Sequence, residues 1–199
     1  MDTQTKTIKT KNKKVIMPNT NSSTIKVQKR DGRLEPLDIN KIHFVVEEAC
    51  EGLSGVSSSQ IEMNANIQFY DGMTTKDIQN VLVRSANDLI SLEAPNYQYA
   101  AAGLLSYDVR KEAHGQYEYI PLLKLVLRNI RLGVYDKGIV DKYTTSDIKR
   151  FNTWIRRDRD LNFTYAGLRQ IVDKSLVQDR STGQLYETPQ DMYLSLIHI

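Results

Sequence analysis

The stretch that most restricts the fold of this 199-residue chain runs from residue 27 to residue 42, VQKRDGRLEPLDINKI. Asp31-Gly32 lies between two extended runs and predicts a tight β-hairpin, because the favoured turn needs positive φ at both central residues, which Gly adopts freely and Asp tolerates. Asp38 then offers a side-chain cap for a helix. We therefore expect two short strands beside a helix N-terminus.

The predicted hairpin gathers charged groups at that helix N-terminus. Lys29 and Arg30 supply two cations, and Glu35 supplies a carboxylate that can accept a hydrogen bond from a sugar hydroxyl or a base amine. Together with free helix amides, these are the groups that a nucleoside triphosphate needs. A solvated hairpin with ordinary surface charges explains the same local pattern, so the alternative stays open at this point.

Apolar spacing indicates four helices in the first half of the chain. The expected starts are Asp38 as a cap, a Ser59–Glu62 capping box, Thr75 as a cap, and Pro95 as a first helical residue. Asp71-Gly72 predicts a turn and Met73 a short third strand. The fourth helix, which ends in Arg110-Lys111, is apolar nearly all round and should be the most buried. Thr75 either completes an anion site with Lys29 or only caps its helix.

An ordered set of motifs is similar to a known family. The first motifs resemble the ATP-cone at the front of class I ribonucleoside-diphosphate reductase large (alpha) subunits. They are Lys29-Arg30-Asp-Gly, Lys41-Ile42, Asp71-Gly-Met-Thr-Thr75, Tyr97-Gln-Tyr and Arg110-Lys111. The later motifs resemble the segment that leads into the catalytic barrel of that enzyme. They are Gly115-Gln-Tyr-Glu118, Tyr135-Asp, Asp158-Arg-Asp160, Phe163-Thr-Tyr165 and Tyr186-Glu-Thr-Pro-Gln190. The resemblance covers residues 24–193.

The resemblance implies a mainly α fold in two parts. Residues 24–115 would form the ATP-cone, a four-helix bundle capped by a small β-hairpin or three-stranded sheet. Residues 116–193 would form the helical N-terminal part of the reductase catalytic domain. On this interpretation the chain is an N-terminal fragment of an enzyme of deoxyribonucleotide synthesis, without the catalytic barrel and inactive alone.

The function that the resemblance implies is allosteric sensing of ATP against dATP, with Mg²⁺ accompanying the nucleotide. No catalytic and no metal-ligating residue is expected, and the implied nucleotide-binding residues are Lys29, Arg30, Glu35, Leu37, Asp38, Lys41, Ile42, Thr75 and Lys111. The implied partners are a small radical-bearing subunit and other large subunits. Gln79 and Asp108 stand where some family members carry histidine, which leaves open a decayed or stand-alone cone without a reductase partner.

Charge and cysteine content exclude several other classes. The formal net charge is +3, and residues 1–23 hold five lysines against Asp2, so the rest of the chain carries +3 − 4 = −1. A near-neutral folded part gives no support to a nucleic-acid-binding face. Residues 1–23 are expected to be a disordered basic tail, and no apolar run suits a signal peptide or a membrane. One cysteine, Cys50, excludes the four-cysteine zinc ribbon of a cone-bearing repressor and favours the cytoplasm.

The second half of the chain predicts further helices. Pro121 begins one, a Thr144–Asp147 capping box begins a long one that carries Trp154 as a core or interface anchor, and another spans residues 165–175. A hairpin is expected around residues 181–183, before a helix start at Pro189. That helix is not expected to continue, because residues 194–199 (LSLIHI) depart from the family and match a translated sequencing adaptor; a genuine short tail is the alternative.

Overall fold

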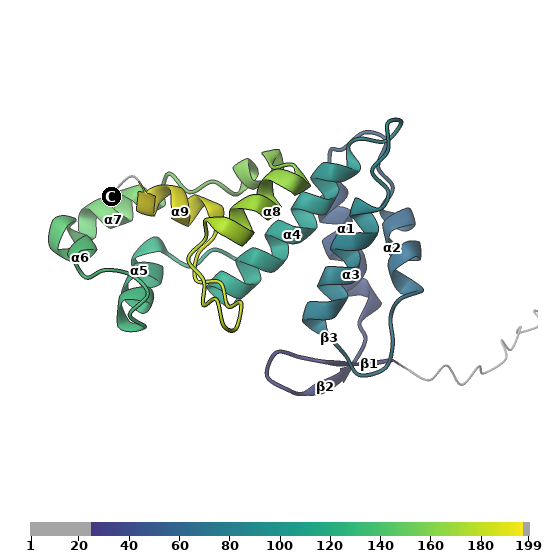
Figure 1. Ribbon diagram of the computed structural model, residues 1–199, viewed down its shortest axis with the longest axis horizontal. Coiled ribbons are helices and arrows are strands. Elements are labelled where there is room, and N and C mark those ends of the chain that lie inside the picture. Colours follow the sequence, from purple (N-terminus) through teal and green to yellow (C-terminus); the bar gives the residue numbers. More distant parts are fainter. Residues whose placement is uncertain (1–24, 197–199) are drawn as a thin grey trace, which may run out of the picture.

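Helices dominate the computed structural model, which describes residues 25–196 (Figure 1). The strands are β1 (Lys26–Gln28), β2 (Leu34–Pro36) and β3 (Met73–Thr74). The first four helices are α1 (Ile39–Cys50), α2 (Ser58–Asn66), α3 (Thr75–Asn87) and α4 (Tyr97–His114). They are followed by α5 (Leu122–Arg131), α6 (Gly138–Lys142), α7 (Thr145–Asn152), the 3₁₀ helix η1 (Arg157–Asn162), α8 (Tyr165–Lys174) and α9 (Pro189–Leu196). The predicted mainly α fold is confirmed, while the expected tail, residues 1–23, lies outside the described residues.

The three strands form one small sheet in the order β2-β1-β3. β1 pairs antiparallel with β2, where Val27 faces Glu35, and parallel with β3, where Val27 faces Met73. The carboxylate of Asp71 accepts a hydrogen bond from the backbone N–H of Lys26 at 2.8 Å, which ties the turn before β3 to the start of β1. The predicted third strand is therefore confirmed.

The hairpin turn differs from the predicted two-residue turn. Only Gly32 has positive φ, at 84°, and no residue other than glycine has positive φ between residues 25 and 196. The carbonyl of Lys29 accepts from the N–H of Gly32 at 3.0 Å, and the N–H of Lys29 donates to Arg33 at 2.8 Å. This longer loop confines the left-handed conformation to glycine. Asp31 keeps negative φ, and its carboxylate accepts from Arg33 Nε at 2.7 Å.

Two predicted helix caps shift by one or two residues. Asp38 caps α1 as predicted and accepts from the N–H of Asn40. α2 is capped by Ser57 rather than Ser59, and α3 by Thr74 rather than Thr75. Ser57 and Thr74 are the last residues with extended backbone, so only their hydroxyls can reach the amides of the first turn. Thr75 is thus the first helical residue, and its hydroxyl is not needed for the cap.

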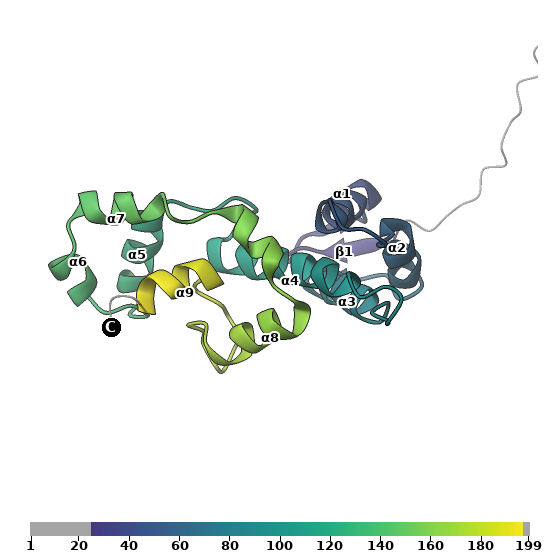
Figure 2. The ribbon, with the colours of Figure 1, turned by 90° about the horizontal axis from the view of Figure 1, so that it is seen from above.

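α4 lies at the centre of the molecule (Figure 2) and is the most buried of the first four helices, as predicted. It begins at Tyr97, two residues after the predicted Pro95. Its Gly103 allows α1 to approach closely, because a Cβ there would lie 3.3 Å from the Cβ of Ala49. One hydrophobic core joins α1, α2 and α3 to α4 and continues into α8 through Leu168 and Val172. The domain boundary expected near Gly115 stays a prediction.

A second, smaller core lies at the other end of the molecule, where α5, α7 and α9 meet. The Thr144–Asp147 capping box is confirmed. The predicted long helix ends early, at Asn152, so Trp154 lies beyond it; the indole is 47% exposed and contacts Phe151 at a ring distance of 5.0 Å. Of the two predicted roles, that of a core anchor was wrong, because the chain leaves the helix before the indole can reach the core. The role of an interface anchor stays a prediction.

α9 continues to Leu196, although the sequence indicated that this helix would not develop. The expectation was wrong because Leu194 is buried in the second core, where packing against α5 and α7 stabilises the helix. Residues 197–199 lie outside the described residues. The adaptor origin of residues 194–199 stays a prediction.

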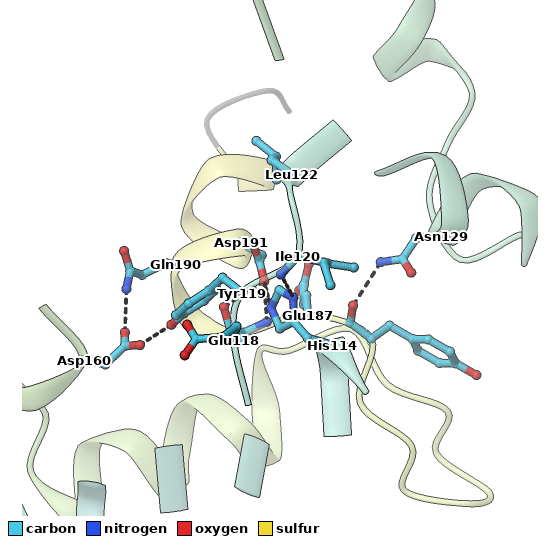
Figure 3. A network of polar contacts seen from close by, with 12 residues as sticks. His114, Glu118, Tyr119, Ile120, Leu122, Asn129, Asp160, Glu187, Gln190 and Asp191 are labelled. Carbon is cyan, nitrogen blue, oxygen red and sulfur yellow. Dashed lines mark hydrogen bonds and ion pairs between the residues drawn. The ribbon is translucent and has the colours of Figure 1, made fainter. Parts of the chain in front are cut away.

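A buried polar network connects the C-terminal end of α4 to the start of α9 (Figure 3). His114 Nε2 lies 3.1 Å from Asp191 Oδ2, while the backbone N–H of Ile120 donates to His114 Nδ1 at 3.2 Å. An N–H can only donate, so the histidine proton lies on Nε2 and is donated to Asp191. Gln190 in turn donates to Asp160 at 2.7 Å. Nearly every buried polar group here has a partner, which fixes α9 relative to α4.

Cys50, at the end of α1, packs against the main core, which agrees with its interpretation as a small core hydrophobe. Burial, and then the charges of Glu62 and Glu47, raise the pKa of its thiol to about 11. At pH 8 the thiolate fraction should be on the order of a hundredfold smaller than in an ordinary cysteine. We expect a thiol-reactive dye to label the folded protein correspondingly more slowly than the urea-unfolded chain; equal rates would contradict the burial of this thiol.

Candidate nucleotide site

The hairpin, α1, α3 and α4 enclose a cavity of about 320 Å³, called the hairpin cavity below. The structure brings eight of the nine predicted nucleotide-binding residues to its walls: Lys29, Glu35, Leu37, Asp38, Lys41, Ile42, Thr75 and Lys111. The ninth, Arg30, lines a neighbouring cavity of about 450 Å³, called the side cavity, which shares Lys29 and Thr75 with the first. The two cavities meet at the N-terminus of α3, whose first amides are not all used within the helix.

Lys111 is the most distinctive cation of the hairpin cavity. It is half-buried, makes no ion pair with any residue between 25 and 196, and its Nζ lies 5.6 Å from the ring centroid of Tyr107. Burial, and then the charges of Arg30 and Lys29, lower the pKa of Lys111. The charged form of this lysine is therefore disfavoured where no anion lies beside it. An anion bound beside it would relieve the crowding of positive charge.

The other cations of the hairpin cavity are held by carboxylates. Lys29 Nζ lies 3.4 Å from Glu35 Oε2, and Lys41 Nζ lies 3.5 Å from Asp38 Oδ2. These pairs are at least partly exposed to solvent, so each contributes little to stability. A phosphate can therefore compete for Lys29 or Lys41 at little cost to the fold.

Asp108, which stands where some family members carry histidine, pairs with Arg30. Arg30 Nη2 and Asp108 Oδ1 are 3.1 Å apart and join the hairpin to α4. Burial raises the pKa of Asp108, and the charge of Arg30 opposes this shift. The pair explains why Arg30 lies outside the hairpin cavity, since its guanidinium is drawn toward α4.

Sequence reasoning missed the apolar wall of the hairpin cavity. Besides Gln79, which the sequence had singled out, the additional lining residues are Val27, Pro36, Asn40, Phe44, Val45, Ile78, Leu82 and Tyr107. Tyr107 could have been found, because it precedes Lys111 by four residues and so shares its face of α4. Gln79 is held by a hydrogen bond from its amide to the carbonyl of Leu104 at 2.8 Å. The cavity thus combines an apolar region of the size of a ligand pocket with a cationic rim.

No group of three or more His, Cys, Asp and Glu side chains that could hold a metal occurs within residues 25–196. A magnesium ion that accompanies a nucleotide commonly takes its ligands from phosphates and water. In the same part of the chain, no helix is both long and apolar enough to cross a membrane.

The first part of the chain thus forms a compact module, a three-stranded sheet on a bundle of four helices, with a cavity rimmed by cations beside the hairpin. Residues 25–112 match the model of the ATP cone domain, so this segment belongs to the ATP-cone family.

The chain is also similar to known reductase subunits over most of its length. It is 44% identical over 173 residues to "Ribonucleoside-diphosphate reductase 1 subunit alpha" of Salmonella typhimurium, covering 87% of this chain and 23% of that protein. The subunit of the same name from Escherichia coli is 45% identical over 168 residues, or 84% of this chain and 22% of the relative. Ribonucleoside-diphosphate reductase subunit alpha of Enterobacteria phage T4 is 38% identical over 174 residues, which cover 86% of this chain and 23% of the relative.

These matches place the chain among relatives of the N-terminal region of ribonucleoside-diphosphate reductase alpha subunits. It spans less than a quarter of the length of these relatives.

Proposed function

We propose that the ATP-cone of this chain senses ATP against dATP for a ribonucleoside-diphosphate reductase large subunit, and so regulates deoxyribonucleotide synthesis. The observation that carries the proposal is the hairpin cavity, where Lys29 and Lys111 face an apolar wall beside the N-terminus of α3. In the proposed complex the two lysines bind phosphates, together with Thr75. Leu37 and Ile42 pack on the base, and Glu35 accepts from base or ribose.

The remaining residues of the proposed site act at its edges. Lys41 adds positive charge, Asp38 orients Lys41 while it caps α1, and Arg30 contacts the nucleotide only from the side cavity. Mg²⁺ would be carried in on the phosphates. The proposed partners are the small radical-bearing subunit and other large subunits, in the cytoplasm.

The proposed mechanism is a change of assembly rather than local catalysis. An effector shifts an equilibrium only by its differential affinity for the two states. ATP and dATP differ by one hydroxyl, so the discrimination must arise where the ribose lies and must be transmitted through α4 to neighbouring parts of the chain.

Isothermal titration calorimetry of the whole 199-residue chain with ATP and with dATP tests this function. The whole chain is preferable to the cone alone, because α8 shares the core of the cone. We expect saturable binding of both nucleotides. Absence of binding would favour the alternative of a decayed cone that serves only as a structural cap.

The 199-residue chain by itself should produce no deoxynucleotide. The chemistry of the proposed family requires several cysteines, and this chain contains one. We expect no product above background in an assay with ribonucleoside diphosphate, a reductant and a small subunit. Product formation that depends on the purified chain would contradict the prediction.

A further inference from the structure

Lys76 and Glu112 form an ion pair at the edge of the side cavity. Lys76 is the second residue of α3, and its Nζ lies 3.2 Å from Oε2 and 3.4 Å from Oε1 of Glu112, in the last turns of α4. The lysine side chain is 49% exposed, whereas that of Glu112 is only 8% exposed. Both residues line the cavity together with Lys29 and Arg30. While the pair is intact, the lysine side chain is therefore less confined by its surroundings than the carboxylate is.

Glu112 also holds the segment between α8 and α9. The backbone N–H of Leu185 donates to Glu112 Oε1 at 3.4 Å, and the side-chain amide of Gln184 donates to the carbonyl oxygen of Glu112 at 3.2 Å. Figure 1 shows this segment beside the C-terminal end of α4. One carboxylate thus connects a lysine at the start of α3 to a segment that lies 73 residues beyond Glu112 along the chain.

Among residues 25–196, three cations line the side cavity, and each of them has a carboxylate partner. Lys29 is paired with Glu35, Arg30 with Asp108, and Lys76 with Glu112. Lys29 and Thr75 also line the hairpin cavity, so phosphates bound at these residues lie at the entrance of the side cavity. A triphosphate carries more negative charge than any one of these carboxylates and competes for the most exposed and flexible cation within reach, which is Lys76.

We propose that Lys76 is a further phosphate-binding residue, which leaves Glu112 and pairs with the nucleotide when the nucleotide binds. Glu112 then has no counter-ion, and the segment around Leu185 that it holds becomes looser. This inference rests on the proposed nucleotide function of the cone. A carboxylate as buried as that of Glu112 is costly without its counter-ion. A nearby triphosphate repels it further, so Glu112 turns toward solvent and releases the amide of Leu185. Nucleotide binding to the cone thereby loosens the segment that leads into α9.

Two measurements on the whole chain test whether Lys76 leaves Glu112 for the nucleotide. They are the hydrogen-exchange rate of the Leu185 amide and calorimetric titration with ATP. In the unsubstituted protein, saturating ATP should raise the exchange rate of this amide by about tenfold. Lys76→Met should weaken ATP binding by roughly three- to tenfold, which is the effect of losing one hydrogen bond of typical net strength, and should abolish the ATP response. Glu112→Gln retains an acceptor oxygen for Leu185 but removes the charge, so ATP should bind at least as well and cause no change at Leu185.

A matched control is Lys149→Met, which removes an exposed lysine of α7 and should change neither quantity. If ATP binds the unsubstituted protein but Leu185 exchange stays constant, or if Lys76→Met binds ATP normally, the inference is overturned while the nucleotide site stands. If the unsubstituted protein binds no ATP, both this inference and the proposed function are overturned. Should Lys76→Met fold poorly, Glu112→Gln gives the same decision through the Leu185 response alone.

Discussion

Replacing Lys111 with alanine should weaken the binding of ATP and dATP alike, by about ten- to hundredfold. Phosphates common to both ligands would lose a hydrogen bond from a charged group, which contributes about 1.5–3 kcal/mol. Lys29→Ala should have a similar effect, because Lys29 faces the same cavity from the hairpin. Calorimetric titration of both variants with both nucleotides measures these losses. Normal affinity in both variants would reject the proposed pocket and favour the solvated-hairpin interpretation.

The stability of the empty protein separates this effect from misfolding. Lys111→Ala should not lower the free energy of unfolding appreciably, because burial and two neighbouring cations already disfavour the charged lysine. Lys149→Ala on α7 serves as a control and should bind both nucleotides normally. Glu35→Ala should instead change the ratio of ATP to dATP affinity, since a carboxylate at base or ribose contacts what distinguishes the two ligands.

Replacing His114 with alanine should lower the free energy of unfolding by about 3 kcal/mol. The side chain is 5% exposed and satisfies the N–H of Ile120 and the carboxylate of Asp191 at once (Figure 3). Its removal leaves a buried N–H without a partner, takes one donor from a buried carboxylate, and opens a cavity. Urea denaturation should show the loss, and the thermal midpoint should fall by about 6–12 °C.

The chain offers a matched control in its other described histidine. His43 on α1 is exposed, and its Nδ1 lies 2.8 Å from Glu62 Oε1. His43→Ala should have a much smaller effect than His114→Ala, because exposed pairs are screened by water and stabilise little. Equal losses in the two variants would show that the network around His114 does not hold α9 to α4.

The sequence by itself determined the local structure of this protein. The cap at Asp38, the capping box at Thr144 and the apolar face of the first helix depend on groups within a few residues of one another, so their spacing is visible in the sequence. The motif residues of the candidate site also line the hairpin cavity, but Thr75 and Lys111 meet the hairpin there only because α3 and α4 pack beside it. Errors within this local range concern one or two residues, as at Thr74 and Thr75, where two adjacent threonines can both act as caps.

Only the tertiary structure decided which distant charges meet. Arg30 pairs with Asp108 across 78 residues and Lys76 with Glu112 across 36, and no local pattern indicates either partner. The packing of α8 on α4 and the extension of α9 to Leu196 likewise depend on burial against elements far along the chain. The physical reason is that capping and periodicity act through neighbouring residues, whereas ion pairs and core contacts exist only once helices have packed and brought those side chains within a few ångströms.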